Sequence, residues 1–318
     1  MKLFIFQQHK IMMVKGKVLS VNLSAKHGVK KPVNELTLTE KGIQGDVHAG
    51  NWNRQVSIID QSHIQRFKKI TEARDTQFGE FAENITSEGL HDIDFQTFDL
   101  LKIGNAILEV TQVGKPFHGQ FQELGNYVMP RVGIFCRVKK TGIIKANDSI
   151  EYIPKVYNAL VITLSDRAST GEYEDRSGPK VVEFLNTYFN KLGVRYQTNR
   201  MVIPDNSNKL THILAKAKKD DIDIIITTGG TGIGKRDITV ETVHPMLDKE
   251  IPGVMEMIRM KYGVEKPNAL LSLGIAGVMG NSLVYTLPGS VKAVNEYMTE
   301  ILKTLQHLIY MLHGIDAH

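Results

Sequence analysis

A buried strand that runs into a glycine-rich turn is the feature that most constrains this chain. Residues 223–241 read DIIITTGGTGIGKRDITVE. The run of isoleucines is typical of a strand that is covered on both faces, as in a parallel sheet. Glycines follow at once, and glycine lets the backbone turn sharply and lets a ligand come close to the amide groups. A strand, a glycine turn and then a helix bring free N–H groups and the positive end of a helix dipole together, which favours an anion.

The glycine spacing leaves two interpretations open, an ordinary turn or a phosphate-binding loop. It matches neither the dinucleotide pattern Gly-x-Gly-x-x-Gly nor the P-loop ending Gly-Lys-Ser/Thr. The acidic residues Asp237 and Glu241 that follow favour a phosphate loop. Mg²⁺ in proteins is bound by one or two carboxylates together with substrate phosphates. The segment therefore indicates a site for a Mg²⁺–nucleotide.

Length and composition narrow the class of protein. At 318 residues the chain is long for one hydrophobic core, so we expect two domains. A net charge of +5 suits small anionic ligands, and the paired lysines at 30–31, 139–140 and 218–219 are interpreted as solvated faces, not as a nucleic-acid surface. The single cysteine, Cys136, excludes an intramolecular disulfide.

The terminus and the hydropathy pattern predict a location. Residues 1–13 form an N-terminal extension without the apolar core and cleavage site of a leader, and Met12 and Met13 are alternative starts. No stretch approaches the ~18 apolar residues of a spanning helix. We therefore expect no membrane insertion and a cytoplasmic protein.

Residues 14–153 read as a β-rich domain. Short apolar segments with turn residues between them are expected to be strands, at 18–23, 55–59, 106–111 and 133–138, and a helix is expected at 61–69. This pattern predicts a barrel-like or sandwich domain. Asp46, His48, Arg54 and Asn84 lie near turns and are either ligands for an anion or heterocycle, or turn formers with a satisfied histidine.

Several ordered motifs in this half resemble the MOSC family. They read GIQGDVH at 42–48, RQVS at 54–57, GEFAENIT at 79–86, LKIG at 101–104, PRVGIF at 130–135 and GIIKAND at 142–148. The resemblance implies a barrel-like domain linked to molybdenum-cofactor sulfur chemistry, with a candidate ligand site at Asp46, His48, Arg54, Asn84 and His118. It departs from the family at Phe117, where MOSC domains commonly carry a cysteine. A phenyl ring cannot hold a persulfide, so this half is expected to bind a pterin or another anion.

From residue 154 to 318 strand-like and helix-like segments alternate. Strands are expected at 159–164, 194–203, 222–228 and 282–287, and helices at 178–191, 206–219 and 290–313. This alternation predicts an α/β domain with a parallel or mostly parallel sheet and helices on both faces. The strand ends carry polar residues, and in such folds ligands lie at the carboxyl ends of the strands. Asp205 is equally compatible with a helix cap, and Ser290 with a cap that also binds phosphate.

The motifs of this half resemble the MogA/MoaB family of molybdopterin adenylyltransferases. They read VITLSDRAS at 161–169, GEYEDRSGP at 171–179, IPD at 203–205, TTGGTG at 227–232, RDITVE at 236–241, IPG at 251–253 and LPGS at 287–290. The resemblance implies a three-layer α/β fold, a trimer or hexamer, and transfer of AMP from Mg-ATP to the terminal phosphate of molybdopterin. It also implies a downstream metal-insertion enzyme as a partner.

The same resemblance implies roles for individual residues. Asp205 and Asp237 match catalytic positions and the Mg²⁺ site. Contacts to substrate or nucleotide are implied for Ser165, Asp166, Ser177, Thr228, Gly229, Gly230, Thr231, Gly232, Glu241, Pro288, Gly289 and Ser290. Bracing of the glycine loop is an alternative role for Glu241.

Two other functions compete with adenylyl transfer. A carrier or scaffold would bind molybdopterin without consuming nucleotide. A sulfur-transfer enzyme would need a thiol in the first half, where Cys136 is the available one. A lone cysteine in a strand-like segment is more often a small buried hydrophobe.

Overall fold

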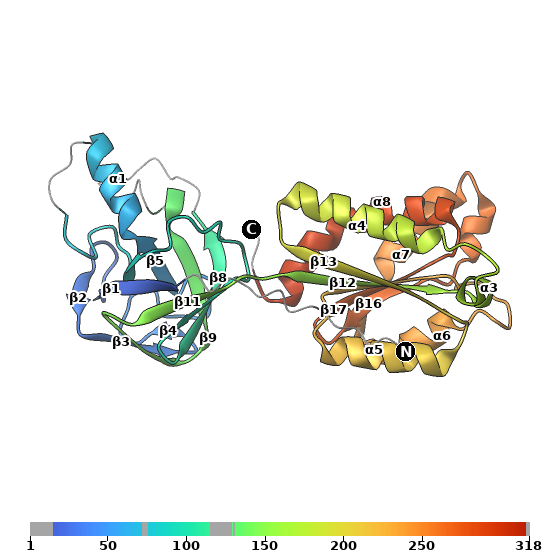
Figure 1. Ribbon diagram of the computed structural model, residues 1–318, viewed down its shortest axis with the longest axis horizontal. Coiled ribbons are helices and arrows are strands. Elements are labelled where there is room, and N and C mark those ends of the chain that lie inside the picture. Colours follow the sequence, from blue (N-terminus) through green and yellow to red (C-terminus); the bar gives the residue numbers. More distant parts are fainter. Residues whose placement is uncertain (1–14, 72–75, 115–128, 130, 316–318) are drawn as a thin grey trace. The chain divides into compact units, whose positions relative to one another are not determined.

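The computed structural model describes residues 15–71, 76–114, 129 and 131–315. The chain divides into two compact units, Met1–Lys155 and Val156–His318 (Figure 1). Each unit is described by itself.

The N-terminal unit contains a closed β-barrel. Its sheet runs in the order β11-β7-β8-β9-β5-β6-β1, and β11 pairs with β1 to close it. β2 extends the sheet from β1, and β10, β3 and β4 form a small separate sheet. The strand bounds are β1 (Lys15–Leu23), β2 (Lys31–Val33), β3 (Glu35–Thr39), β4 (Gly42–Ile43), β5 (Val56–Asp60), β6 (Ile85–Glu88), β7 (Leu100–Ile103), β8 (Ala106–Val113), β9 (Ile134–Lys140), β10 (Gly142–Lys145) and β11 (Ser149–Ile153). Of the two β architectures that the sequence predicts for this half, the barrel is the one observed.

Aliphatic side chains fill this barrel. Val18, Ile58, Leu101 and Cys136 belong to one buried cluster, and each is 0% exposed. Helix α1 (Gln61–Thr71) follows β5, and Phe67 packs edge-on against Phe81 with ring centroids 5.9 Å apart. The predicted strands at 18–23, 55–59, 106–111 and 133–138 and the predicted helix at 61–69 each coincide with an element of this unit.

The C-terminal unit is built on a mostly parallel sheet in the order β13-β12-β14-β17-β16-β15. Pairings β12–β13, β12–β14 and β14–β17 are parallel, whereas β16 and β15 join antiparallel. The strand bounds are β12 (Tyr157–Leu164), β13 (Tyr196–Ile203), β14 (Ile224–Thr228), β15 (Lys249–Glu250), β16 (Ala276–Met279) and β17 (Ser282–Leu287). The isoleucines of β14 are 0% exposed, as expected for a strand covered on both faces.

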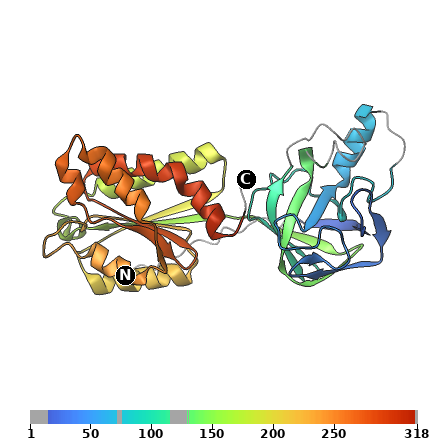
Figure 2. The same ribbon diagram turned by 180° about the vertical axis from the view of Figure 1, so that it is seen from behind.

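Helices cover both faces of this sheet. Figure 1 shows α4, α7 and α8 on one face and α5 and α6 on the other, and Figure 2 shows the same arrangement from behind. The helix bounds are α3 (Asp166–Thr170), α4 (Ser177–Leu192), α5 (Ser207–Lys219), α6 (Thr239–Val243), α7 (Pro252–Gly263) and α8 (Val291–Leu312), with 3-10 turns η1 (His244–Met246) and η2 (Pro267–Leu271). Among the described helices, none is long and apolar enough to cross a bilayer.

The strand register brings the carboxyl ends together. Leu164 at the end of β12 is opposite Ile203, the last residue of β13, and Thr163 is opposite Thr228, the last residue of β14. Thr228 is in turn opposite Leu287, the last residue of β17. The four polar segments that follow these strands therefore start at one edge of the sheet, as the sequence predicts.

Candidate functional site

The glycine loop after β14 adopts a backbone that only glycine takes without strain. Gly229 and Gly230 have φ angles of +100° and +64°, in the left-handed region. A β-carbon at Gly229 would also collide with the carbonyl oxygen of Leu164, and one at Gly230 would lie 2.5 Å from Oγ1 of Thr239. The glycines are therefore required by the turn itself and by the close approach of β12.

Hydrogen bonds hold this loop against the neighbouring segments. The amide of Thr239 donates to the Gly230 carbonyl at 3.0 Å, and its hydroxyl donates to the Gly229 carbonyl at 2.8 Å. Thr228 Oγ1 donates to the carbonyl of Pro288 at 3.0 Å. These bonds connect the loop to α6 on one side and to the Pro288–Ser290 turn on the other.

Asp205 and Asp237 both lie close to the same loop. A β-carbon at Gly230 would be 3.6 Å from Oδ1 of Asp205, and one at Gly232 would be 2.7 Å from Oδ2 of Asp237. Burial raises the pKa of Asp205, and the charge of Asp237 raises it further. Two carboxylates that repel each other beside a glycine loop are a donor set that suits Mg²⁺ with substrate phosphates. Within the described residues, no group of three or more His, Cys, Asp or Glu side chains is placed to hold a metal ion. A cation at Asp205 and Asp237 would therefore need further ligands, such as substrate phosphates.

Asp166 connects Asp205 to the glycine loop. The amide of Asp205 donates to Oδ1 of Asp166 at 3.0 Å, and the amide of Asp166 donates to Oδ2 of Asp205 at 3.2 Å. Arg236, from the loop, forms an ion pair with Asp166. Ser165 caps α3 by accepting from the amide of Ala168 at 3.2 Å. Asp166 therefore holds the Asp205 segment and the loop together.

A pocket of about 430 Å³ opens beside this loop. Seven of its sixteen lining residues come from predicted site segments, namely Gly230, Thr231, Gly232, Asp237, Pro288, Gly289 and Ser290. The hydroxyl of Ser290 caps α8 by accepting from the amide of Ala293 at 3.2 Å. The pocket therefore joins the glycine loop to the N-terminus of a 22-residue helix.

Other predicted residues do not line this pocket. Thr228, Gly229 and Asp205 are not among its lining residues, and Ser177 is buried at the start of α4 beside Asp175. Glu241 is exposed in the first turn of α6. Direct ligand contact for Ser165, Asp166 and these residues therefore stays a prediction.

Sequence reasoning missed nine of the sixteen lining residues. The missed residues are Lys266, Asn268, Ala269, Leu271, Ser272, Lys292, Ala293, Glu296 and Tyr297. Helical spacing from the cap at Ser290 points to Ala293 and then to Glu296 and Tyr297, so a signal for these existed. No such pattern predicts Lys266. Its Nζ donates to Oε1 of Glu296 at 2.5 Å, although the two residues are thirty positions apart in the sequence.

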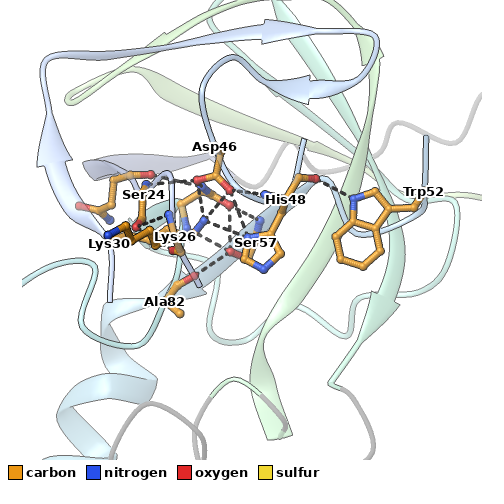
Figure 3. A network of polar contacts seen from close by, with 10 residues as sticks. Ser24, Lys26, Lys30, Asp46, His48, Trp52, Ser57 and Ala82 are labelled. Carbon is orange, nitrogen blue, oxygen red and sulfur yellow. Dashed lines mark hydrogen bonds and ion pairs between the residues drawn. The ribbon is translucent and has the colours of Figure 1, made fainter. Parts of the chain in front are cut away.

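The N-terminal unit holds a buried polar network around Asp46 (Figure 3). Nζ of Lys30 donates to both oxygens of Asp46, at 2.8 and 2.6 Å. Nδ2 of Asn84 donates to Oδ2 of Asp46 at 2.9 Å, and Oδ1 of Asn84 accepts from the Ser57 amide at 3.1 Å. Nδ1 of His48 lies 3.1 Å from Oδ1 of Asp46 and 3.4 Å from Nζ of Lys30.

Lys30 corrects an expectation from the sequence. The pair Lys30–Lys31 was expected on a solvated face, but Lys30 is 1% exposed. Burial lowers the pKa of Lys30, and its hydrogen bond and ion pair with Asp46 oppose that change. For Asp46, burial alone would raise the pKa, but hydrogen bonds from His48 and Lys30 outweigh burial and keep the pKa below its ordinary value. The two side chains are therefore held as an internal ion pair.

An exposed aromatic group lies next to this ion pair. The rings of His48 and Trp52 stack with centroids 5.9 Å apart, and Arg54 lies 5.2 Å above the Trp52 ring. The structure thus brings together Asp46, His48, Arg54 and Asn84, whereas His118 and Phe117 lie outside the described residues. Cys136 is fully buried, and burial raises the pKa of its thiol. A protonated, inaccessible thiol is a poor nucleophile.

The C-terminal unit is an α/β domain whose parallel strands end at one pocket. A glycine loop and the N-terminus of α8 line that pocket. Residues 160–307 match the family described as a probable molybdopterin binding domain, and residues 44–151 match the MOSC domain. The molybdenum cofactor biosynthesis protein B of Bacillus cereus is 37% identical over 164 residues, which are 50% of this chain and 93% of that protein.

Pyrococcus furiosus provides a further relative in sequence and a similar solved structure. Its molybdopterin adenylyltransferase is 37% identical over 163 residues, 49% of this chain and 91% of that protein. The crystal structure of its tungsten cofactor synthesizing protein MoaB covers 50% of this chain and 98% of that chain, at 34% identity and a TM-score of 0.44. The chain therefore belongs to the MogA/MoaB family and carries a MOSC domain in its N-terminal half.

Proposed function

We propose that the C-terminal unit transfers AMP from Mg-ATP to the terminal phosphate of molybdopterin, within molybdenum cofactor biosynthesis. The observation that carries this proposal is the pocket that joins the glycine loop, Asp237 and the N-terminus of α8, with Asp205 beside it. The name of the Pyrococcus furiosus relative, molybdopterin adenylyltransferase, supports the reaction class.

The proposed reaction needs no strong base, because the nucleophile is already an anion. An oxygen of the molybdopterin phosphate attacks the α-phosphorus of ATP, the new P–O bond forms, and the bond to the β-phosphate oxygen breaks. Pyrophosphate leaves with that electron pair. The amides of residues 230–232 and of residues 291–292, which precede the capped amide of Ala293 in α8, would stabilise the negative charge that develops.

Asp205 and Asp237 would hold the cation that accompanies ATP. When bound, Mg²⁺ neutralises phosphate charge and lets two anions approach each other. Asp166 would keep Asp205 in place through the two backbone hydrogen bonds that connect them. Lys292, which also lines the pocket, adds a positive charge for a phosphate.

We also propose a domain plan and an assembly. The plan is an extension at 1–13, a MOSC domain at 14–153 and a MogA/MoaB-like domain at 154–318 with the three-layer α/β arrangement. We propose a homo-oligomer, a trimer or hexamer, that is cytoplasmic and supplies a metal-insertion enzyme. Exposed apolar side chains on and beside α7 and η2 suit self-association: Met257, Met260, Val264, Leu270, Leu271 and Leu273.

The N-terminal unit has an accessory role in this proposal. The surface formed by His48, Trp52 and Arg54 combines a planar ring with positive charge, which suits a pterin or another flat anion. A sulfur-transfer role would require a persulfide on Cys136, and mass spectrometry of the protein after incubation with a sulfur donor tests for it. The buried thiol predicts no mass increase.

The experiment for the main proposal is incubation of the full chain with molybdopterin, ATP and Mg²⁺. Adenylyl-molybdopterin and pyrophosphate are the expected products. Tight pterin binding with no nucleotide consumed, under conditions where an established member of the family turns over, would establish the carrier or scaffold instead.

A further inference from the structure

The pocket that would receive two polyanions contains a second carboxylate besides that of Asp237. Glu296, on α8, has a side chain that is 15% exposed, and it lines the same pocket as Gly230 and Ser290. A negative charge in this position opposes phosphate binding, so its presence needs another explanation.

Two ordinary explanations account for only part of what is observed. A second metal site is not indicated, because within the described residues Glu296 belongs to no cluster of three metal-ligating side chains. A structural tether is present, since Nζ of Lys266 donates to Oε1 of Glu296 at 2.5 Å and connects the segment before η2 to α8. That bond uses one acceptor site of a carboxylate that offers about four.

The remaining acceptor sites suit a ligand with two adjacent N–H donors. A carboxylate pairs in a bidentate way with a ring that presents an amino group next to a ring N–H. The 2-amino-4-oxo-pyrimidine edge of a pterin presents this pair. The adenine of ATP presents an amino group next to an unprotonated ring nitrogen, which a carboxylate repels.

We propose that Glu296 binds the amino-pyrimidinone edge of the pterin and so determines which heterocycle occupies this part of the pocket. The inference rests on the proposed function, because that function makes a pterin the substrate. Lys266 is a positioning residue: its ion pair fixes the carboxylate and partly offsets its charge. Lys292 and the N-terminus of α8 remain available for the phosphate end of the ligand.

The test compares pterin with lumazine, which carries an oxygen in place of the 2-amino group. Binding of each free compound to the full chain is measured by titration calorimetry. The wild-type protein is expected to prefer pterin by about 10- to 100-fold, the range for hydrogen bonds to a charged group. Glu296→Gln keeps the size of the side chain but replaces one acceptor oxygen by an NH2 donor, which cannot pair with a second N–H of the ligand, so the preference is expected to fall to less than about threefold.

The matched control is Glu183→Gln on α4. Glu183 also pairs with a lysine, Lys180, at 2.8 Å, but it is not a pocket residue. Its pterin preference is expected to equal that of the wild type. A Glu296→Gln variant with the wild-type preference for pterin over lumazine would overturn the inference, and a ratio of two affinities is insensitive to partial loss of folded protein.

Turnover separates this inference from the proposed function. In Glu296→Gln, KM for molybdopterin is expected to rise while KM for ATP stays unchanged. If the wild-type protein makes adenylyl-molybdopterin and Glu296→Gln has an unchanged KM for molybdopterin, the function stands and the inference fails. If pterin selectivity depends on Glu296 but no product forms, the inference stands and the proposed reaction fails.

Discussion

Asp46 in the N-terminal unit and Asp205 in the C-terminal unit are two carboxylates in opposite electrostatic situations. Asp46 is fully surrounded by donors, from Lys30, His48 and Asn84, and its pKa lies below the ordinary value. Asp205 is partly buried beside Asp237, and its pKa lies above the ordinary value. The protein's own side chains stabilise the charge on Asp46, whereas the charge on Asp205 is opposed by its neighbour.

This difference separates a carboxylate that the fold itself satisfies from one that we propose to act in the site. Burial of a charge is tolerated when partners satisfy it, as at Asp46. Two carboxylates that raise each other's energy are characteristic of a site that is completed by a ligand or cation.

Replacing Asp46 should cause the largest loss of stability. Asp46→Ala leaves the buried ammonium of Lys30 without its partner, so we expect the free energy of unfolding of the N-terminal unit to fall by about 3–5 kcal/mol. Trp52 is the one tryptophan in the sequence, so its fluorescence during urea unfolding reports on this unit. The control is Asp92→Ala, which removes a carboxylate with 91% exposure and is expected to change stability by less than about 0.5 kcal/mol. Equal effects of the two substitutions would show that the Asp46 network does not stabilise the fold.

Replacing Asp237 should affect turnover and leave the fold intact. Asp237→Ala removes one of the two carboxylates proposed to hold the cation, and we expect kcat to fall about 100-fold or more, which corresponds to about 2.7 kcal/mol. The measurement is steady-state formation of pyrophosphate, with circular dichroism to verify folding. Asp248→Ala, at an exposed aspartate paired with Lys218, is the matched control and should keep the wild-type rate. Unchanged turnover in Asp237→Ala would remove this residue from the mechanism.

The two carboxylates should respond to pH in opposite directions. The pKa of Asp46 is lower in the folded state, so its stabilising effect is present above the ordinary value of ~3.9 and is lost as pH falls below it. The pKa of Asp205 is higher in the folded state, so its contribution to stability is lost as pH rises from ~3.9 through the raised pKa.

Stability curves of single variants between pH 3 and 7 isolate each contribution. Subtracting the curve of Asp46→Asn from that of the wild type should leave a difference that grows with pH, and the same subtraction for Asp205→Asn should leave one that shrinks with pH. Two differences with the same slope would contradict the comparison.

The smallest expected effect is a gain of stability in Asp205→Asn near neutral pH. The substitution removes repulsion between two partly solvated carboxylates, so the gain should be below about 1 kcal/mol after solvent screening. Thermal unfolding followed by circular dichroism measures it, with Asp248→Asn as the exposed control. A loss of stability in Asp205→Asn would mean that its hydrogen bond to the Asp166 amide outweighs the repulsion.

Local patterns predicted much of the fold. The isoleucines at 224–226 and the helical spacing within 206–219 predict β14 and α5, because a strand covered on both faces and an amphipathic helix each leave a periodic signature. Helix α7, by contrast, was absent from the prediction. It has two buried apolar side chains, Met255 and Ile258, in its central turns, which is a weak periodic signal.

Some residues of the candidate site could likewise be predicted from local sequence, and others could not. Gly229, Gly230 and Ser290 could be predicted because their roles depend on neighbouring residues alone. The two glycines form a left-handed turn, and Ser290 caps a helix. The burial of Lys30 and the ion pair of Lys266 with Glu296 could not be predicted, because both depend on contacts between distant segments. A charged residue looks the same in the sequence whether it faces solvent or a buried partner.

The pairing of β1 with β11 also has a consequence for how the protein is made. Gly16 lies opposite Ile150, so the first and last strands of the barrel complete each other. During synthesis on the ribosome, the barrel cannot close until β11 has emerged, and until then the edge of β1 that pairs with β11 is exposed. A nascent chain truncated before residue 149 lacks β11, so we expect it to depend on chaperones.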